Sequence, residues 1–283
     1  MQNDDIVGRV EVSEVDHDSV LAERKGRVLV LTLNRPQRNN AWTFAMGNRY
    51  FDLLDEADED DGVGTIVVTG SGPSFCVGMD TESLTQASQQ GVLRRPSKNR
   101  RMPHAMTIRK PIIAAINGRC AGFGLVQALD CDIRFCADTA VFATAFVRRG
   151  LAAEYGSSWL LPRIVGQGRA AELLLSGRKF DAAEAASMGL VTRVYPAADL
   201  LAESLAYATD IAESCSPIAM ADTKHQLDTD WLLGREEAED RAKILSHEPG
   251  HRVDFAEGVT SYRERRPPRF APLPERSAPP SSR

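Results

Sequence analysis

The sequence predicts an α/β protein whose core strands run parallel. Short, continuous apolar stretches such as residues 65–69 (TIVVT) alternate with longer amphipathic stretches such as residues 43–57. A strand without polar alternation is typical of a parallel sheet that is covered on both faces. The repeated order of strand, helix and strand therefore favours parallel pairing through right-handed crossovers.

The elements are expected in the following order. The expected strands are residues 27–34, 65–69, 111–116, 133–136 and 140–143. Helices are expected at residues 43–57 and 125–129, in two pieces within 154–175 that Pro162 and Gly166 break, from Asp181, and over most of 197–264. Thr43 is a suitable N-cap, and Asp181 with Glu184 has the spacing of a capping box.

This pattern divides the chain into four parts. Residues 1–20 form an acidic lead-in that we expect to be disordered, and residues 21–196 form the core of strands and helices. Residues 197–270 form a helical C-terminal portion, and the Pro/Ser-rich tail at 271–283 is again expected to be disordered.

Composition and charge exclude several function classes. The 283 residues carry a net charge of −5, which argues against a nucleic-acid partner. No apolar run approaches the ~20 residues of a membrane span, and the N-terminus lacks the apolar region of a signal peptide. Five cysteines without a CxxC pair indicate free thiols in a reducing cytoplasm. The five histidines lack metal-binding spacing, so no metal site is expected.

Residues 111–133 (PIIAAINGRCAGFGLVQALDCDI) contain the first functional signal. A strand there enters a glycine-rich turn and then a helix, which gathers unpaired backbone N–H groups at one point. Such groups can bind an anion or a developing oxyanion. The mouth of this helix offers no acid, base or nucleophile of its own.

Residues 83–129 contain no Asp or Glu but eight Arg or Lys. This stretch is either a solvated basic face or a loop that meets phosphates on a ligand, and both interpretations stay open. The chain contains no complete GxGxxG, no GxxxxGK[ST] and no GxSxG, which disfavours a dinucleotide enzyme, a P-loop enzyme or a serine hydrolase.

Six stretches, in order, resemble one known family. They are 31–42 (LTLNRPQRNNAW), 70–80 (GSGPSFCVGMD), 110–142, 150–166 (GLAAEYGSSWLLPRIVG), 173–196 and 254–270. Together they resemble the enoyl-CoA hydratase/isomerase (crotonase) superfamily. The resemblance implies a spiral of ββα units, a helical C-terminal trimerisation portion, and a homotrimer or dimer of trimers. It also implies an acyl-CoA thioester as ligand, with coenzyme A as part of the substrate and no separate cofactor.

The resemblance further implies an oxyanion hole of two backbone N–H groups. By position these belong to Met79, which follows Gly78, and to Phe123, which lies between Gly122 and Gly124. The glycines matter because they allow a tight turn and a close approach of the backbone. Positions implied to contact the substrate are Arg38, Asp80, Thr81, Glu82 and Trp159, and further phosphate contacts are Arg or Lys within 94–110, Arg265 and Arg266.

The sequence departs from the family's hydratases at one important point. Val126 and Phe146 occupy the positions of the two hydratase glutamates, and neither side chain can move a proton. Glu154 matches the position at which the family's dienoyl-CoA isomerases and dehalogenases carry an aspartate. We expect Glu154 at a helix start, where burial would raise its pKa and the helix N-terminus would lower it.

Three hypotheses follow. The first is an acyl-CoA enzyme in which Glu154 alone transfers the proton, as in the isomerases. The second is a hydrolase or dehalogenase in which Glu154 is the nucleophile. The third is an acyl-CoA-binding protein that has lost both hydratase glutamates and performs no chemistry. His104, in the basic stretch, is interpreted as an exposed histidine rather than a catalytic partner.

Overall fold

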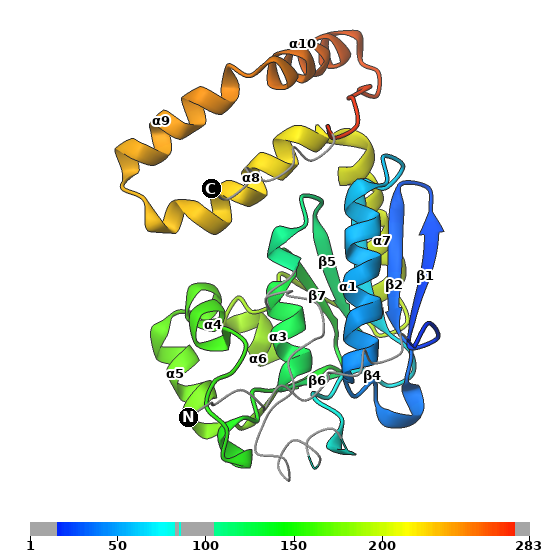
Figure 1. Cartoon of the computed structure of the whole chain (residues 1–283), viewed down its shortest axis with the longest axis vertical. Helices are drawn as coiled ribbons and strands as arrows, with labels where there is room; N and C mark the ends of the chain where they lie inside the picture. Colours follow the sequence, from blue (N-terminus) through cyan, green and yellow to red (C-terminus); the bar gives the residue numbers. More distant parts are fainter. Residues whose placement is uncertain (1–15, 83–84, 86–104, 275–283) are drawn as a thin grey trace, which may run out of the picture.

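The structure, a computed structural model, describes residues 16–82, 85 and 105–274. It contains a body of two β-sheets with covering helices and an extension of helices at the C-terminal end (Figure 1). The lead-in and tail that we expected to be disordered lie largely outside the described residues, as do His104 and the basic positions from Arg94 to Arg101.

The larger sheet has the strand order β1-β2-β3-β5-β7-β10. Its strands are β1 Val20–Lys25, β2 Val28–Leu33, β3 Thr65–Gly70, β5 Ile112–Ile116, β7 Ile133–Ala137 and β10 Arg193–Tyr195. All neighbours pair in parallel except β1 and β2, which form an antiparallel hairpin. The expected parallel core is thus confirmed. β1 was not among the expected strands, because after Val20 all of its residues are exposed and carry no apolar alternation.

The smaller sheet has the order β4-β6-β8-β9 and consists of three-residue strands. They are β4 Ser74–Cys76, β6 Arg119–Ala121, β8 Val141–Ala143 and β9 Lys179–Asp181. A long strand of the first sheet is followed by a short strand of the second and then by a helix, as in β5, β6 and α3 (Phe123–Asp130). This repeated ββα unit places the start of α3 directly after a strand of the smaller sheet.

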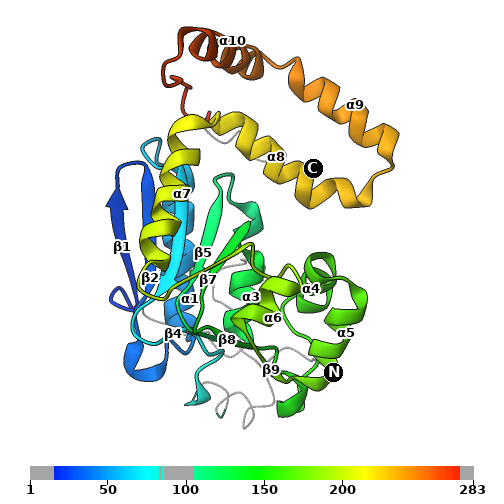
Figure 2. The ribbon, with the colours of Figure 1, turned by 180° about the vertical axis from the view of Figure 1, so that it is seen from behind.

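Helices cover both faces of the larger sheet. α1 (Phe44–Glu59) lies on one face and α7 (Leu200–Ser214) on the other, as the two opposite views show (Figures 1 and 2). The strands follow this arrangement, because Leu31 and Ile66 pack in the cluster that contains α1 whereas Val30 and Val67 pack in the cluster that contains α7. The Thr43 hydroxyl accepts a hydrogen bond from the Met46 amide at 3.2 Å, which confirms the predicted N-cap.

The helices after β8 differ from expectation in two respects. α4 (Ser157–Val165) contains Pro162 without a break, and only Gly166, with φ of 82°, separates it from α5 (Gln167–Ser176). Glu154 also precedes α4 instead of starting it, because Gly156 adopts the left-handed conformation (φ 76°) immediately before the helix. The short α6 (Ala182–Ser187) begins as predicted, with the Asp181 carboxylate accepting from the Glu184 amide at 2.8 Å.

The C-terminal extension consists of α8 (Pro217–Thr229), α9 (Arg235–Ser246) and α10 (Pro249–Glu264), which stand away from the body (Figures 1 and 2). The short 3-10 turns are η1 Pro36–Arg38, η2 Ala105–Thr107, η3 Val147–Arg149 and η4 Asp230–Leu232. Several large apolar side chains of the extension are exposed, among them Leu232, Phe255 and Tyr262. Trimerisation through this portion stays a prediction. None of the described helices is long and apolar enough to cross a membrane.

Lys224 connects the extension to the body. Its ammonium group contacts Asp132 Oδ2 at 2.8 Å and the carbonyl oxygens of Ala105 and Lys110 at 3.3 and 3.2 Å. The Lys224→Met variant removes this charge and leaves the Asp132 carboxylate without its cation. We expect the free energy of unfolding to fall by about 2 kcal/mol, measured by urea denaturation.

The matched control for Lys224 is Lys243→Met in α9, whose ion pair with Asp240 is exposed. That change is expected to remain within about 0.5 kcal/mol of the parent protein. Equal stabilities of the two variants would contradict the anchoring role of Lys224.

Candidate active site

Two glycine turns meet where β4 and β6, neighbouring strands of the smaller sheet, end. Gly78 has φ of 105° and Gly122 has φ of 53°, values that favour glycine. A Cβ atom added to Gly122 would lie 3.8 Å from the Gly78 Cα atom, and one added to Gly78 would lie 3.6 Å from the Phe123 nitrogen. The turn after β4 and the first residue of α3 are therefore in direct contact.

This contact brings the amides of Met79 and Phe123 together. Trp42 donates to the Gly78 carbonyl at 2.8 Å and accepts from the Asp80 amide at 2.8 Å, so Met79 is held between two hydrogen bonds. Its own amide donates no hydrogen bond to any described residue. The Phe123 amide, at the first position of α3, likewise donates none within the described chain. Two N–H groups on adjoining turns are thus without an acceptor in the part of the chain that the structure describes.

Gly124 allows α3 to approach β4 closely. A Cβ atom at this position would lie 2.1 Å from the Cys76 carbonyl oxygen, which leaves no room for any side chain. The short distance between α3 and β4 fixes the position of Phe123 relative to the Gly78 turn. The geometry agrees with the expectation that the glycines, and not the Met or Phe side chains, shape this part of the site.

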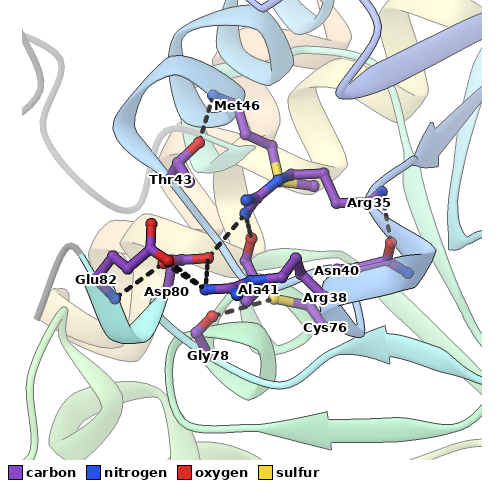
Figure 3. A network of polar contacts seen from close by, with 10 residues as sticks. All are labelled: Arg35, Arg38, Asn40, Ala41, Thr43, Met46, Cys76, Gly78, Asp80 and Glu82. Carbon is purple, nitrogen blue, oxygen red and sulfur yellow. Dashed lines mark hydrogen bonds and ion pairs between the residues drawn. The ribbon is translucent and has the colours of Figure 1, made fainter.

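A buried carboxylate holds the Met79 turn in place (Figure 3). Asp80 is only 2% exposed and accepts hydrogen bonds from Arg35 Nη1 at 3.2 Å, Arg38 Nη2 at 3.4 Å and the Glu82 amide at 3.0 Å. Burial by itself raises the pKa of Asp80, but the Glu82 amide and the Arg35 guanidinium outweigh it and lower the pKa below its ordinary value. Asp80 is therefore an ionised clamp on the turn.

Arg35 completes the clamp, because its Nη1 atom also donates to the Ala41 carbonyl at 2.5 Å. The residues between β2 and α1 are thereby tied to the residues after β4 (Figure 3). Sequence analysis missed Arg35, since no local pattern pairs it with a carboxylate 45 positions away. It placed Asp80 among the ligand contacts, whereas the structure shows its carboxylate occupied by this intramolecular network.

Aromatic rings surround the Phe123 side chain. Its ring centroid lies 5.0 Å from that of Trp42 and 4.7 Å from that of Tyr155. Val126, one turn further along α3, is 1% exposed, and Phe146 is 6% exposed. The two positions that would carry hydratase glutamates are therefore part of the apolar core.

Glu154 lies in the loop before α4 and is partly buried. The adjacent Tyr155 ring packs edge-on against Phe123, which connects this loop to the start of α3. The Glu154 carboxylate forms no hydrogen bond or ion pair with a described residue. Burial raises its pKa above the ordinary value. The expected opposing effect of a helix N-terminus is wrong, since α4 starts only at Ser157.

The remaining predicted contacts differ in their exposure and in their intramolecular partners. Thr81 and Glu82 are exposed, and Arg38 is shared between Asp80 and Glu82. Trp159 lies in α4, with the Arg163 guanidinium 3.8 Å above its ring.

Several of the basic residues proposed for phosphates have intramolecular partners. Arg109 pairs with Asp58 at 2.8 Å, and Lys110 donates to the carbonyls of Ala57 and Asp60. Arg266 pairs with both Glu257 and Glu264. These contacts fix loops and helix ends, so they compete with any role in holding phosphate.

The parts of the site can polarise a carbonyl oxygen and move one proton, which is the equipment of an enzyme that works through an enolate. The profile of the enoyl-CoA hydratase/isomerase family matches residues 23–272. The chain belongs to this family, and it is an enzyme of the hydratase/isomerase type with the crotonase fold.

Individual relatives agree with this assignment. The chain is 34% identical over 255 residues to a protein named probable enoyl-CoA hydratase echA8 from Mycobacterium bovis, covering 90% of this chain and 98% of that one. It is 33% identical over 264 residues to the peroxisomal Delta(3,5)-Delta(2,4)-dienoyl-CoA isomerase of Arabidopsis thaliana, with coverages of 87% and 93%. A crystal structure of a probable enoyl-CoA hydratase/isomerase from Mycobacterium abscessus superposes with a TM-score of 0.83 at 34% identity, covering 90% and 99% of the two chains.

Proposed function

We propose that this enzyme isomerises the double bond of an acyl-CoA thioester by single-carboxylate proton transfer. The observation that carries the proposal is Glu154, a partly buried carboxylate that has no partner among the described residues, on the loop whose next residue packs against Phe123. The relative named as a dienoyl-CoA isomerase supports the choice of isomerisation.

In the proposed mechanism the thioester oxygen accepts hydrogen bonds from the amides of Met79 and Phe123. Glu154 takes a proton from the γ carbon, the double bond moves, and the negative charge passes to the thioester oxygen as an enolate. The same carboxyl group then returns the proton to the α carbon. Each amide donor is worth about 3 kcal/mol of transition-state stabilisation.

Hydration fits this site less well. Adding water across the double bond needs one group to activate the water and another to protonate the α carbon. Val126 and Phe146 supply neither, and both are buried in the apolar core. The relatives named as hydratases therefore support the substrate class more strongly than they support the reaction.

Two alternatives are kept as proposals. The first alternative, binding of an acyl-CoA without chemistry, is favoured by the apolar residues Val126 and Phe146 at the positions of the hydratase glutamates. Nucleophilic attack by Glu154, as in a hydrolase or dehalogenase, is compatible with the carboxylate having no described partner, but nothing near it is identified to activate water for the second step.

We also propose a cytoplasmic homotrimer, or a dimer of trimers, without a separate cofactor. The exposed apolar side chains of the extension support the assembly.

The proposal is tested by incubating the protein in D₂O with trans-2- and trans-3-enoyl-CoA and following both compounds by mass spectrometry and NMR. We expect the two isomers to interconvert and deuterium to enter the α or γ carbon. Formation of 3-hydroxyacyl-CoA as the main product would assign hydration instead. Release of free coenzyme A would assign hydrolysis, and binding without deuterium incorporation would assign a non-catalytic function.

A further inference from the structure

A cavity of about 680 Å³ lies between the body and the C-terminal extension. The C-terminal end of α3 forms one wall with Leu129 and Asp130, and α4 contributes Trp159 and Leu160. The opposite wall comes from α8 and η4, with Leu227 and Trp231. A mainly apolar cavity of this size can hold a small organic ligand, and its few polar groups decide which one.

Asp130 is the unusual polar group of this cavity. It is only 5% exposed, its side chain forms no hydrogen bond or ion pair with any described residue, and its Oδ1 atom is fully buried without a partner. Burial, with a smaller contribution from the Asp228 carboxylate, raises the pKa of Asp130 well above its ordinary value. Burial therefore favours the protonated, uncharged form of Asp130, in which the carboxyl group can both donate and accept a hydrogen bond.

The cations around the cavity do not neutralise Asp130. Lys224 is occupied by Asp132 and two carbonyls, Arg134 donates to the carbonyls of Leu190 and Cys131, and Arg163 lies over Trp159. These positive groups disfavour a cationic ligand, and the carboxyl groups of Asp132 and Asp228, which also line the cavity, disfavour an anionic one. The lining thus favours an uncharged, largely apolar ligand that carries one hydroxyl or oxo group.

The position of Asp130 relates this cavity to the oxyanion turn. Asp130 follows Val126 by four residues and so lies on the same face of α3, one turn further from Phe123. Asp130 lies seven positions after Phe123, a rise of roughly 10 Å along the helix axis. With carbon–carbon bonds near 1.5 Å, an extended acyl chain covers that distance with about eight carbons.

We propose that the cavity receives the distal end of a medium-length acyl group, and that Asp130 selects chains bearing a hydroxyl or oxo group at that end. The inference rests on the proposed function for the position of the thioester, and it adds the class of acyl group. An unsubstituted chain would leave the Asp130 carboxyl without a partner, which is unfavourable for a buried polar group.

Tryptophan fluorescence provides a direct test, because Trp159 and Trp231 both line the cavity. The full-length protein is titrated with 8-hydroxyoctanoyl-CoA and with octanoyl-CoA. We expect the hydroxylated thioester to bind about tenfold more tightly, the effect of one satisfied buried hydrogen bond. Asp130→Leu should abolish this preference, and Asp130→Asn should retain part of it. Asp199→Leu, at an exposed position, is the control and should leave it unchanged.

Equal affinities of the parent protein for the two thioesters would overturn the inference. A preference for the hydroxylated thioester that remains in Asp130→Leu would also overturn it, as would the absence of binding of either thioester to the parent protein. If the leucine variant does not fold, the comparison of thioesters on the parent protein still decides the matter.

Deuterium exchange separates this inference from the proposed reaction. The protein could prefer the hydroxylated thioester in a way that depends on Asp130, yet exchange no deuterium at the α or γ carbon of the corresponding enoyl-CoA compounds. That result would support the inference and reject the isomerase. Deuterium exchange that is the same with and without the hydroxyl group, and the same in the parent protein and the Asp130 variants, would support the isomerase and reject the inference.

Discussion

The Glu154→Gln variant is expected to lose isomerisation by about 10²–10⁴-fold in kcat, the usual contribution of a positioned acid–base group. Glutamine keeps the size and hydrogen-bonding capacity of the side chain but cannot accept the γ proton. The partly buried carboxylate has no ion pair with a described residue, so its removal leaves no unpaired charge behind. Binding of a saturated acyl-CoA should therefore change little.

The pH profile gives this prediction an independent readout. Proton abstraction needs the ionised form of Glu154, and burial raises its pKa. The rate must then fall as the pH decreases through the raised pKa, so the acidic limb of kcat/KM lies at higher pH than for an exposed glutamate. In the glutamine variant that limb should disappear from the residual rate.

Glu213→Gln, at an exposed position of α7, is the matched control and should retain both the rate and the profile. If Glu154→Gln retains more than a tenth of the parent activity, another group moves the proton and the proposed role of Glu154 is wrong.

The fold was predictable because its strands are strongly apolar and because the residues that cap its helices lie close to them in the sequence. β3 and β5 are continuous buried runs, and Thr43 and Asp181 cap their helices by contacts within three residues. β1 was missed because its side chains are exposed and only pairing with β2 makes it a strand. Pro162 was expected to break a helix, but α4 tolerates the missing N–H group and ends only where Gly166 adopts a positive φ.

The candidate site was predictable in its backbone and less so in its side chains. The glycines around Met79 and Phe123 are visible in the sequence, and the structure brings the two turns into contact. The occupation of Asp80 by Arg35 and Arg38 depends on residues more than 40 positions apart, for which no sequence period exists. The same holds for Asp130, since α8 must be placed before its cavity exists. The catalytic roles themselves stay predictions.

Gly122→Ala is the second change with a large expected effect. Gly122 has φ of 53° and ψ of −123°, a combination that an L side chain adopts only at a cost of about 1–3 kcal/mol. Space is not the obstacle, because the nearest atom to an added Cβ lies 3.8 Å away. The backbone should relax by rotating the peptide bond that carries the Phe123 amide, which then no longer points at the thioester oxygen. We expect kcat to fall by about 10²–10³-fold, the effect of losing one oxyanion donor.

The control for this backbone effect is Gly26→Ala in the β1–β2 hairpin. Gly26 also has a positive φ of 61° and no atom within 4 Å of an added Cβ, so an alanine there also meets the strain of a positive φ, but far from α3. Both variants should lose stability, measured by urea denaturation, but only Gly122→Ala should lose kcat. Because the donor acts on the charge that develops in the transition state, the affinity for a saturated acyl-CoA should fall much less than kcat. Parallel losses of affinity and kcat would show that Gly122 shapes the binding site as a whole and does not orient the Phe123 amide.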